Sequence, residues 1–248
     1  MKLKFFSSYV LLIGVLLFTV IQEFSYGDSE DKYRSERERM VTTQIDFRHV
    51  KDGRIGVKNE AVLEAMLRVP RHKFVPRKSQ SRAYVDSPLP IGYDQTISQP
   101  YIVAYMTEQL KPKKDYKALE IGTGSGYQAA VLSGLVRHVY TIEIIEDLGK
   151  RTKKRLKDMK YKNITVKIGD GYFGWKEHSP YDIIIVTAAP NHIPPSLVQQ
   201  LKPGGVMCIP VGGRFQVQSL ILVQKDKDGS VKTKQIMPVR FVPLTRNH

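Results

Sequence analysis

The apolar residues of this chain form two kinds of pattern. Short runs rich in β-branched and aliphatic residues, each with a single charged residue, predict buried strands. The runs cover residues 118–121, 139–143, 164–168 and 181–186. Elsewhere apolar residues recur at helical spacing, as in the segment that follows Pro100. This alternation predicts a single α/β domain with a Rossmann-like doubly wound sheet and an N-terminal helical extension.

The run at 118–121 leads into a glycine-rich turn. Gly122, Gly124 and Gly126 stand at alternate positions shortly after the acidic Glu120. Glycine allows a sharp turn and a close approach of the backbone to a ligand, because a Cβ atom would block one or both. A dinucleotide-binding turn would have its third glycine at position 127, where this chain has Tyr127. The spacing therefore favours S-adenosylmethionine over NAD.

Two acidic residues follow the next predicted strands. Glu143 ends the run at 139–143, about twenty residues after the glycines, where an α/β unit places an acid for ribose hydroxyls. The alternative is that Glu143 only begins a solvated helix. Asp170, beside Gly171, stands where the following strand ends and is a candidate acceptor for an adenine amino group. A Gly-Asp-Gly sequence is, however, more often a plain turn.

The net charge of the 248 residues is +15, which usually indicates attraction to polyanions, membrane surfaces or acidic substrates. Many of the bases lie between residues 150 and 160 and fit the solvated face of one amphipathic helix. No aromatic residues alternate with them, as a surface for single-stranded nucleic acid requires. We therefore expect no nucleic-acid partner. The six histidines and Cys208 show no metal-ligand spacing, so we expect no metal.

The N-terminus has the pattern of an export signal. Lys2 and Lys4 precede an apolar stretch at 9–21, and small residues follow at the positions that a signal peptidase reads. We expect residues 1–27 to be a signal peptide. An uncleaved membrane anchor is the alternative, although the stretch is short for a full span. Residues 28–39 are highly charged and are interpreted as a spacer, which leaves 40–248 as the folded domain.

A polar loop at 88–100 precedes the helix that follows Pro100. Ser98 is placed to cap that helix and Pro100 fits its first turn, so capping alone can account for both residues. A serine ahead of the predicted cofactor strand is also placed to turn its hydroxyl toward a substrate. Arg240 could pair with a substrate carboxylate, although a basic residue on an edge strand is more often solvated.

Six motifs follow one another along the chain. They are QTISQP at 95–100, EIGTGSGY at 120–127, GDG at 169–171, YDIIIVTAA at 181–189, LKPGG at 201–205 and VRFVPL at 239–244. In this order they resemble the protein-L-isoaspartate O-methyltransferase family, from about Arg39 to the C-terminus. The glycine turn and LKPGG are shared by many S-adenosylmethionine enzymes, whereas TISQP together with VRFVPL is close to diagnostic. The export signal departs from the usual cytosolic family member.

The resemblance implies methyl transfer from S-adenosylmethionine to the free carboxylate of L-isoaspartyl residues in damaged proteins and peptides. The methyl ester then closes to a succinimide, whose hydrolysis returns some normal aspartate. A carboxylate is ionised at neutral pH, so no strong general base is expected. The family resemblance gives Ser98 the role of hydrogen-bonding the substrate carboxylate. It assigns the cofactor to Gln95, Thr96 and Ile97, to Glu120, Gly122, Gly124 and Gly126 at the methionine end, to Glu143 at the ribose, and to Asp170 and Gly171 at the adenine.

Two other functions stay open at this point. A methyltransferase acting on RNA or a small molecule would share the cofactor motifs, although no nucleobase-stacking motif or RNA-binding appendage is present. A non-catalytic envelope protein on the same fold would instead use its basic surface on anionic polymers. We expect isoaspartyl-containing proteins and peptides as partners, and membrane contact that is transient or made by the N-terminal segment. We expect a monomer in the periplasm or envelope, with the cytoplasm as the alternative.

Overall fold

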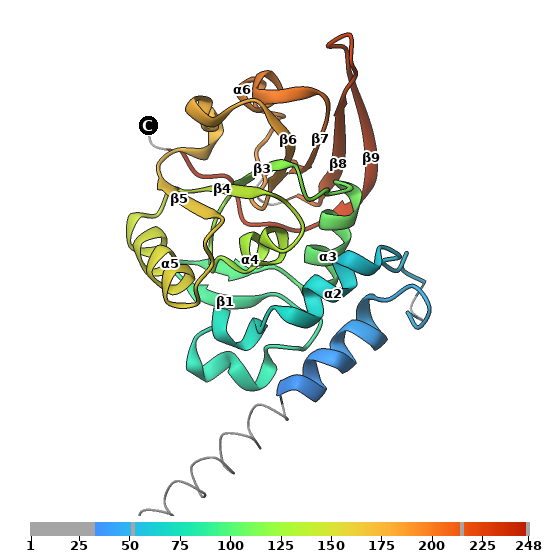
Figure 1. The fold of residues 1–248 in the computed structure, drawn as a ribbon, viewed down its shortest axis with the longest axis vertical. Helices are drawn as coiled ribbons and strands as arrows, with labels where there is room; N and C mark the ends of the chain where they lie inside the picture. Colours follow the sequence, from blue (N-terminus) through green and yellow to red (C-terminus); the bar gives the residue numbers. More distant parts are fainter. Residues whose placement is uncertain (1–32, 51–52, 214–215, 247–248) are drawn as a thin grey trace, which may run out of the picture.

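The computed structural model describes residues 33–50, 53–213 and 216–246. Their centre is a seven-stranded sheet in the order β5-β4-β3-β6-β7-β8-β9 (Figure 1). The strands are β3 Lys117–Ile121, β4 His138–Glu143, β5 Ile164–Ile168, β6 Tyr181–Val186, β7 Leu201–Val211, β8 Gln218–Lys225 and β9 Val231–Val239. Strands β3 to β7 are parallel, and β8 and β9 add an antiparallel edge. The predicted doubly wound sheet is thus confirmed.

Helices cover both faces of this sheet. They are α2 Glu60–Arg68, α3 Pro100–Gln109, α4 Tyr127–Ser133, α5 Glu146–Asp158 and α6 Pro195–Gln200. Successive side chains of a strand face opposite sides, and the packing follows this alternation. Ala118 and Ile183 belong to the core that includes α2 to α5, whereas Leu119 and Ile184 belong to a second core that includes Leu197 of α6. Strands buried on both faces explain why the runs of the sequence are mostly apolar rather than alternating between apolar and polar residues.

The strand order creates a crevice at one end of the sheet. From β3 the chain proceeds outward to β4 and β5, and then returns to β6 on the other side of β3. The loops that leave β3 and β6 therefore diverge at the carboxyl ends of two adjacent strands, which is where open α/β sheets bind ligands. A short hairpin of β1 Leu89–Gly92 and β2 Gln95–Ile97 lies ahead of α3 in the sequence and forms a separate two-stranded sheet.

The N-terminal part of the described chain is helical. Residues 33–40 form a helix that continues into the π-helical turn η1 Val41–Ile45. The ring of Tyr33 stacks on His72 with centroids 4.0 Å apart, and Arg37 donates to the Tyr84 hydroxyl. Tyr33 and Arg37 therefore contact the domain from within the segment 28–39 that is expected to be a spacer, and residues 28–32 of that segment lie outside the described residues.

The predicted signal segment, residues 1–27, lies outside the described residues. Within the ranges that the structure covers, no helix is both long and apolar enough to cross a membrane.

The short 3-10 helices lie in the connections. They are η2 Arg71–Phe74 and η3 Arg77–Arg82 before the hairpin, and η4 Gly171–Phe173 and η5 Lys176–His178 between β5 and β6.

Candidate active site

The glycine turn after β3 has the backbone that its sequence requires. Gly122, Gly124 and Gly126 all have positive φ angles, of 93°, 52° and 85°. A Cβ atom on Gly122 would lie 2.5 Å from the Oγ1 atom of Thr187, the first residue after β6. Only glycine therefore allows the β3 and β6 loops to approach this closely. Gly126 then begins α4.

Glu120 lies beneath this turn and is fully buried. Its Oε2 atom accepts a hydrogen bond of 2.5 Å from the Thr141 hydroxyl, whereas Oε1 has no hydrogen-bond partner in the described structure. Burial raises the pKa of Glu120 to about 8. The residue also lines a narrow cavity, of about 30 Å³, together with Gly122 and Gly124. An unpartnered carboxylate oxygen at a cavity fits a ligand that brings a hydrogen-bond donor or a positive charge.

Glu143 ends β4 and closes the other side of the turn. Its two carboxylate oxygens accept hydrogen bonds from the backbone N–H groups of Gly124, at 2.7 Å, and Ile145, at 3.1 Å. Burial raises the pKa of this carboxyl group, and the two backbone hydrogen bonds oppose that rise. Glu143 lines a second narrow cavity, of about 50 Å³, with Gln95, Thr96 and Gly171 among its neighbours. The structure thus places these four predicted cofactor residues around one space.

Asp170 follows β5 and holds the start of η4. Its Oδ1 atom accepts from the backbone N–H of Tyr172 at 2.9 Å, so the residue does form the turn that a Gly-Asp-Gly sequence favours. The Oδ2 atom is buried without a hydrogen-bond partner in the described structure, and the Nε atom of Arg246 lies 3.7 Å from it. Gly171 lines the second narrow cavity, whereas its neighbour Asp170 is not among the residues that line it.

Ser98 lies between β2 and α3, one residue before the helix cap. The N-cap is Gln99, and the Ser98 hydroxyl makes no hydrogen bond to the described residues. The expected capping role is therefore wrong, because an acid from elsewhere in the chain takes it. The Oδ1 atom of Asp86 accepts from the backbone N–H of Tyr101, in the first turn of α3, at 3.0 Å. The Ser98 hydroxyl is left for another partner.

Asp86 makes contacts near Ser98 with three groups, which are the Arg54 side chain, the Gln99 side chain and the backbone of α3. Besides the α3 backbone, it accepts from the Gln99 side chain at 2.8 Å and pairs with Arg54 at 2.5 Å. Arg54 lies in the segment between Asp46 and Val57, two residues that form an isolated parallel bridge. Its guanidinium also lies over the Tyr101 ring, 4.3 Å from the centroid.

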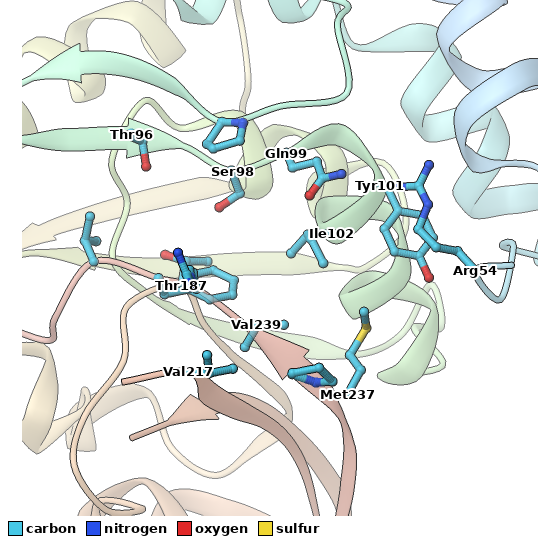
Figure 2. Close-up of a pocket in the computed structure, with 15 residues that line it drawn as sticks. Arg54, Thr96, Ser98, Gln99, Tyr101, Ile102, Thr187, Val217, Met237 and Val239 are labelled. Carbon is cyan, nitrogen blue, oxygen red and sulfur yellow. The ribbon is translucent and has the colours of Figure 1, made fainter. Parts of the chain in front are cut away.

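A large cavity of about 450 Å³ opens on the other side of Ser98. Figure 2 shows Ser98, Gln99 and Ile102 on one wall, Val217, Met237 and Val239 of the β8–β9 region on the opposite wall, and Thr187 between them. Its further lining residues are Arg54, Pro88, Thr96, Tyr101, Pro238, Arg240, Phe241 and Val242. Ser98, Thr96 and Thr187 also line the narrow cavity beside Glu120. The large and narrow cavities therefore meet at these three residues.

The sequence did not reveal every residue of this site. Arg54, Asp86 and Val217 lie outside the six motifs, and only the three-dimensional fold brings them to the large cavity or to Ser98. Thr187 could have been found from the sequence, because it directly follows an apolar run at the end of the sheet where ligands bind. Among the described residues, no three His, Cys, Asp or Glu side chains are grouped so that they could hold a metal ion.

Comparison with known proteins agrees with this geometry. The sequence model of a family described as Protein-L-isoaspartate(D-aspartate) O-methyltransferase (PCMT) matches residues 46–248. Protein-L-isoaspartate O-methyltransferase 2 of Syntrophobacter fumaroxidans is 54% identical over 237 residues, which are 94% of this chain and 96% of the relative. Protein-L-isoaspartate O-methyltransferase 1 of Cupriavidus necator is 60% identical over 187 residues, 75% of this chain and 72% of the relative.

Solved structures give the same result. A protein-L-isoaspartate O-methyltransferase structure matches with a TM-score of 0.68 and 30% identity, covering 75% of this chain and 61% of the other. A β-aspartate methyltransferase from Plasmodium falciparum, solved in complex with S-adenosyl-L-homocysteine, matches with a TM-score of 0.67 and 25% identity over 77% of this chain and 93% of the other.

Proposed function

Because the chain belongs to the protein-L-isoaspartate(D-aspartate) O-methyltransferase family, we propose that Ser98 orients the isoaspartyl carboxylate where two ligand cavities meet. The enzyme methylates isoaspartyl residues of proteins with S-adenosylmethionine as the methyl donor. One observation carries the proposal for Ser98. Its hydroxyl has no partner among the described residues and lines both the large cavity and the narrow cavity beside Glu120.

The narrow cavities fit the donor. S-adenosylmethionine brings an electrophilic methyl group on a positively charged sulfur, and an amino group at its methionine end. The unpartnered Oε1 atom of Glu120 suits that amino group. We assign the methionine end also to Gly122, Gly124 and Gly126, and the ribose to Glu143. We assign the adenine to Asp170 and Gly171. The buried Oδ2 atom of Asp170 suits an amino donor. Gln95, Thr96 and Ile97 cover the donor from the hairpin.

The large cavity fits the acceptor. Its walls are mainly apolar with a few polar groups, and its volume of about 450 Å³ is in the range of sites that enclose a small ligand. An isoaspartyl side chain and its neighbouring peptide units are of that size. Ile55 and Val217 are exposed apolar residues. Val217 lines this cavity, and so does Arg54, the residue before Ile55 in the sequence. A polypeptide substrate can cover such residues.

Methyl transfer requires the protein to align the carboxylate with the methyl donor and does not require it to transfer a proton. The isoaspartyl carboxylate is ionised at neutral pH, so no residue has to remove a proton from it. One carboxylate oxygen forms the new C–O bond while the S–C bond of the donor breaks, and both charges diminish. The rate then depends on the distance and angle between the two groups and on the exclusion of water. A serine hydroxyl can donate a hydrogen bond to the second carboxylate oxygen and so fix its direction.

The direct test uses labelled S-adenosylmethionine and two peptides that differ only in L-isoaspartate or normal aspartate. We expect a base-labile label on the isoaspartyl peptide alone. Labelling of neither peptide by a folded protein that binds the cofactor would contradict the acceptor assignment. The Ser98→Ala variant then tests the role of the serine.

Cellular location and assembly are separate proposals. The basic start, apolar stretch and small residues of 1–27 support export to the periplasm or envelope, with this segment cleaved or kept as an anchor. Fractionation of cells followed by N-terminal sequencing of the mature protein tests both points. Intact Met1 in the cytoplasmic fraction would contradict export. We also propose a monomer, which light scattering of the purified protein tests directly.

A further inference from the structure

The charged residues that line the large cavity are both arginines. They are Arg54 and Arg240, and none of the described residues that line this cavity has a carboxylate. The two are not equivalent. Arg54 is paired with Asp86 at 2.5 Å, so its charge is compensated inside the protein. Arg240 is exposed and has no acidic partner within the part of the chain that the structure describes.

The backbone just after Arg240 is held by hydrogen bonds from two other parts of the chain. The neighbouring Phe241 donates its N–H to the Oε1 atom of Gln218 at 2.8 Å and accepts from Nε2 of the same side chain at 3.3 Å. Gln218 is buried, with 2% of its surface exposed. The carbonyl of Val242, two residues after Arg240, accepts from the N–H of Ala189 at 2.8 Å. Arg240 therefore projects from a fixed backbone, which lowers the entropy that binding has to offset.

Arg240 and Ser98 approach the cavity from different walls. Arg240 directly follows β9, and Val239, the last residue of that strand, lies across the cavity from Ser98 in Figure 2. If Ser98 holds the reacting carboxylate, the Arg240 guanidinium meets a different part of the same substrate. A guanidinium binds carboxylates through paired hydrogen bonds and recognises them better than it recognises neutral groups.

We propose that Arg240 is a specificity-determining residue that binds a second carboxylate of the substrate, close in sequence to the isoaspartyl residue. This carboxylate is an acidic side chain or the end of the chain. The inference rests on the proposed placement of the isoaspartyl group at Ser98. It predicts that the enzyme prefers isoaspartyl sites in acidic surroundings, such as those left by deamidation within Asp- and Glu-rich segments.

The experiment uses isoaspartyl peptides with acetylated and amidated ends. A single Glu, Gln or Lys is placed in turn at each of the two positions before and after the L-isoaspartate, and kcat/KM is measured for each peptide. At one or more positions we expect Glu to exceed Gln by about two- to fivefold, the range of an exposed ion pair, and Lys to fall below Gln. A Gln peptide with a free C-terminus tests whether the second carboxylate can be the end of the chain. High salt reduces these preferences, because exposed charges are screened.

Variants of Arg240 decide the assignment. Arg240→Gln should abolish the ratio between Glu and Gln peptides, and Arg240→Glu should invert it in favour of Lys. A role in folding alone cannot invert a preference. The control is Lys234→Gln, which removes the same charge from an exposed position on strand β9, ahead of Arg240 and not among the residues that line the cavity.

Each outcome has one meaning. An unchanged ratio in Arg240→Gln, or no preference at any position in the natural protein, overturns the proposal. An equal loss for all peptides in Arg240→Gln also overturns it, because the arginine would then act on the reacting carboxylate. Failure to methylate any isoaspartyl peptide contradicts the proposed acceptor site instead.

Discussion

Arg151 of α5 donates a hydrogen bond of 2.6 Å from its Nη2 atom to the backbone carbonyl of Ile91 in the β1–β2 hairpin. The same guanidinium lies over the ring of Tyr93, 5.4 Å from its centroid. This contact holds the hairpin, and with it Gln95 and Thr96, against the cofactor side of the sheet. Gln95 and Thr96 line the narrow cavity that Glu143 and Gly171 also line. The position of the hairpin therefore sets the space that is left for the cofactor.

Replacing Arg151 with Gln should weaken cofactor retention. A hydrogen bond of this kind contributes about 0.5–1.5 kcal/mol, so we expect the KM for S-adenosylmethionine to rise about two- to tenfold and kcat at saturation to change less. Steady-state kinetics with varied cofactor measures both. Lys153→Gln, an exposed position on the same helix, is the control. Equal effects of the two substitutions would show that only the helix charge matters.

Ser98→Ala should lower the rate of methyl transfer and leave cofactor binding unchanged. A hydrogen bond to a charged group contributes about 1.5–3 kcal/mol, so kcat/KM for the isoaspartyl peptide should fall about ten- to a hundredfold. Calorimetric titration with S-adenosylhomocysteine gives the cofactor affinity. The exposed Ser81, changed to Ala, is the control. Unchanged transfer by Ser98→Ala would remove the orienting role.

Glu143→Gln should weaken cofactor binding with the fold intact. The amide keeps one oxygen, which can accept from one of the two backbone N–H groups that the carboxylate now satisfies. It also loses the charge that strengthens hydrogen bonds from ribose hydroxyls. We expect the dissociation constant to rise about tenfold or more. Circular dichroism checks the fold. Glu146→Gln changes an exposed acid three residues later and should leave the affinity unchanged; identical affinity for both variants would withdraw the ribose assignment.

Glu120 should make the stability of the ligand-free protein depend on pH. Its pKa is raised from 4.5 to about 8 by burial, so the folded state keeps a proton that the unfolded state has released. The resulting stabilisation is complete below the unfolded pKa and is lost as pH rises toward about 8. Denaturant unfolding from pH 5 to 8 should therefore show a fall in the free energy of unfolding. In Glu120→Gln this fall should be smaller, and an identical slope in both proteins would contradict the assignment.

The parts of the site that follow single strands were predictable from the sequence. Glu120, Glu143 and Asp170 each stand at or just after the end of an apolar run, and parallel strands bring such ends to one edge of the sheet. The positive φ angles of the glycine turn follow from the same local pattern. These features depend on short-range rules, because a strand that is buried on both faces has few alternative positions.

The remaining parts depend on long-range contacts that no local pattern encodes. Asp86, not Ser98, accepts the α3 backbone hydrogen bond, and its partner Arg54 is 32 residues away in the sequence. Tyr33 packs on His72 although its neighbours are mostly charged and exposed. The wall made by Val217 and Val239 exists because β8 and β9 pair as an edge hairpin. Its residues carry no polar group that would mark them as part of a site.

The shared carboxylate of Asp86 also bears on how such a protein can be recombined or diversified. The loop that carries Arg54, the start of α3 and the Gln99 side chain all depend on this one acid. A chimera that imports a foreign N-terminal segment without an equivalent of Arg54 would leave a partly buried negative charge uncompensated beside Ser98. The segment that carries Arg54 and the residues from Asp86 to Tyr101 are therefore a single unit of exchange, and a library that varies one should carry the other with it.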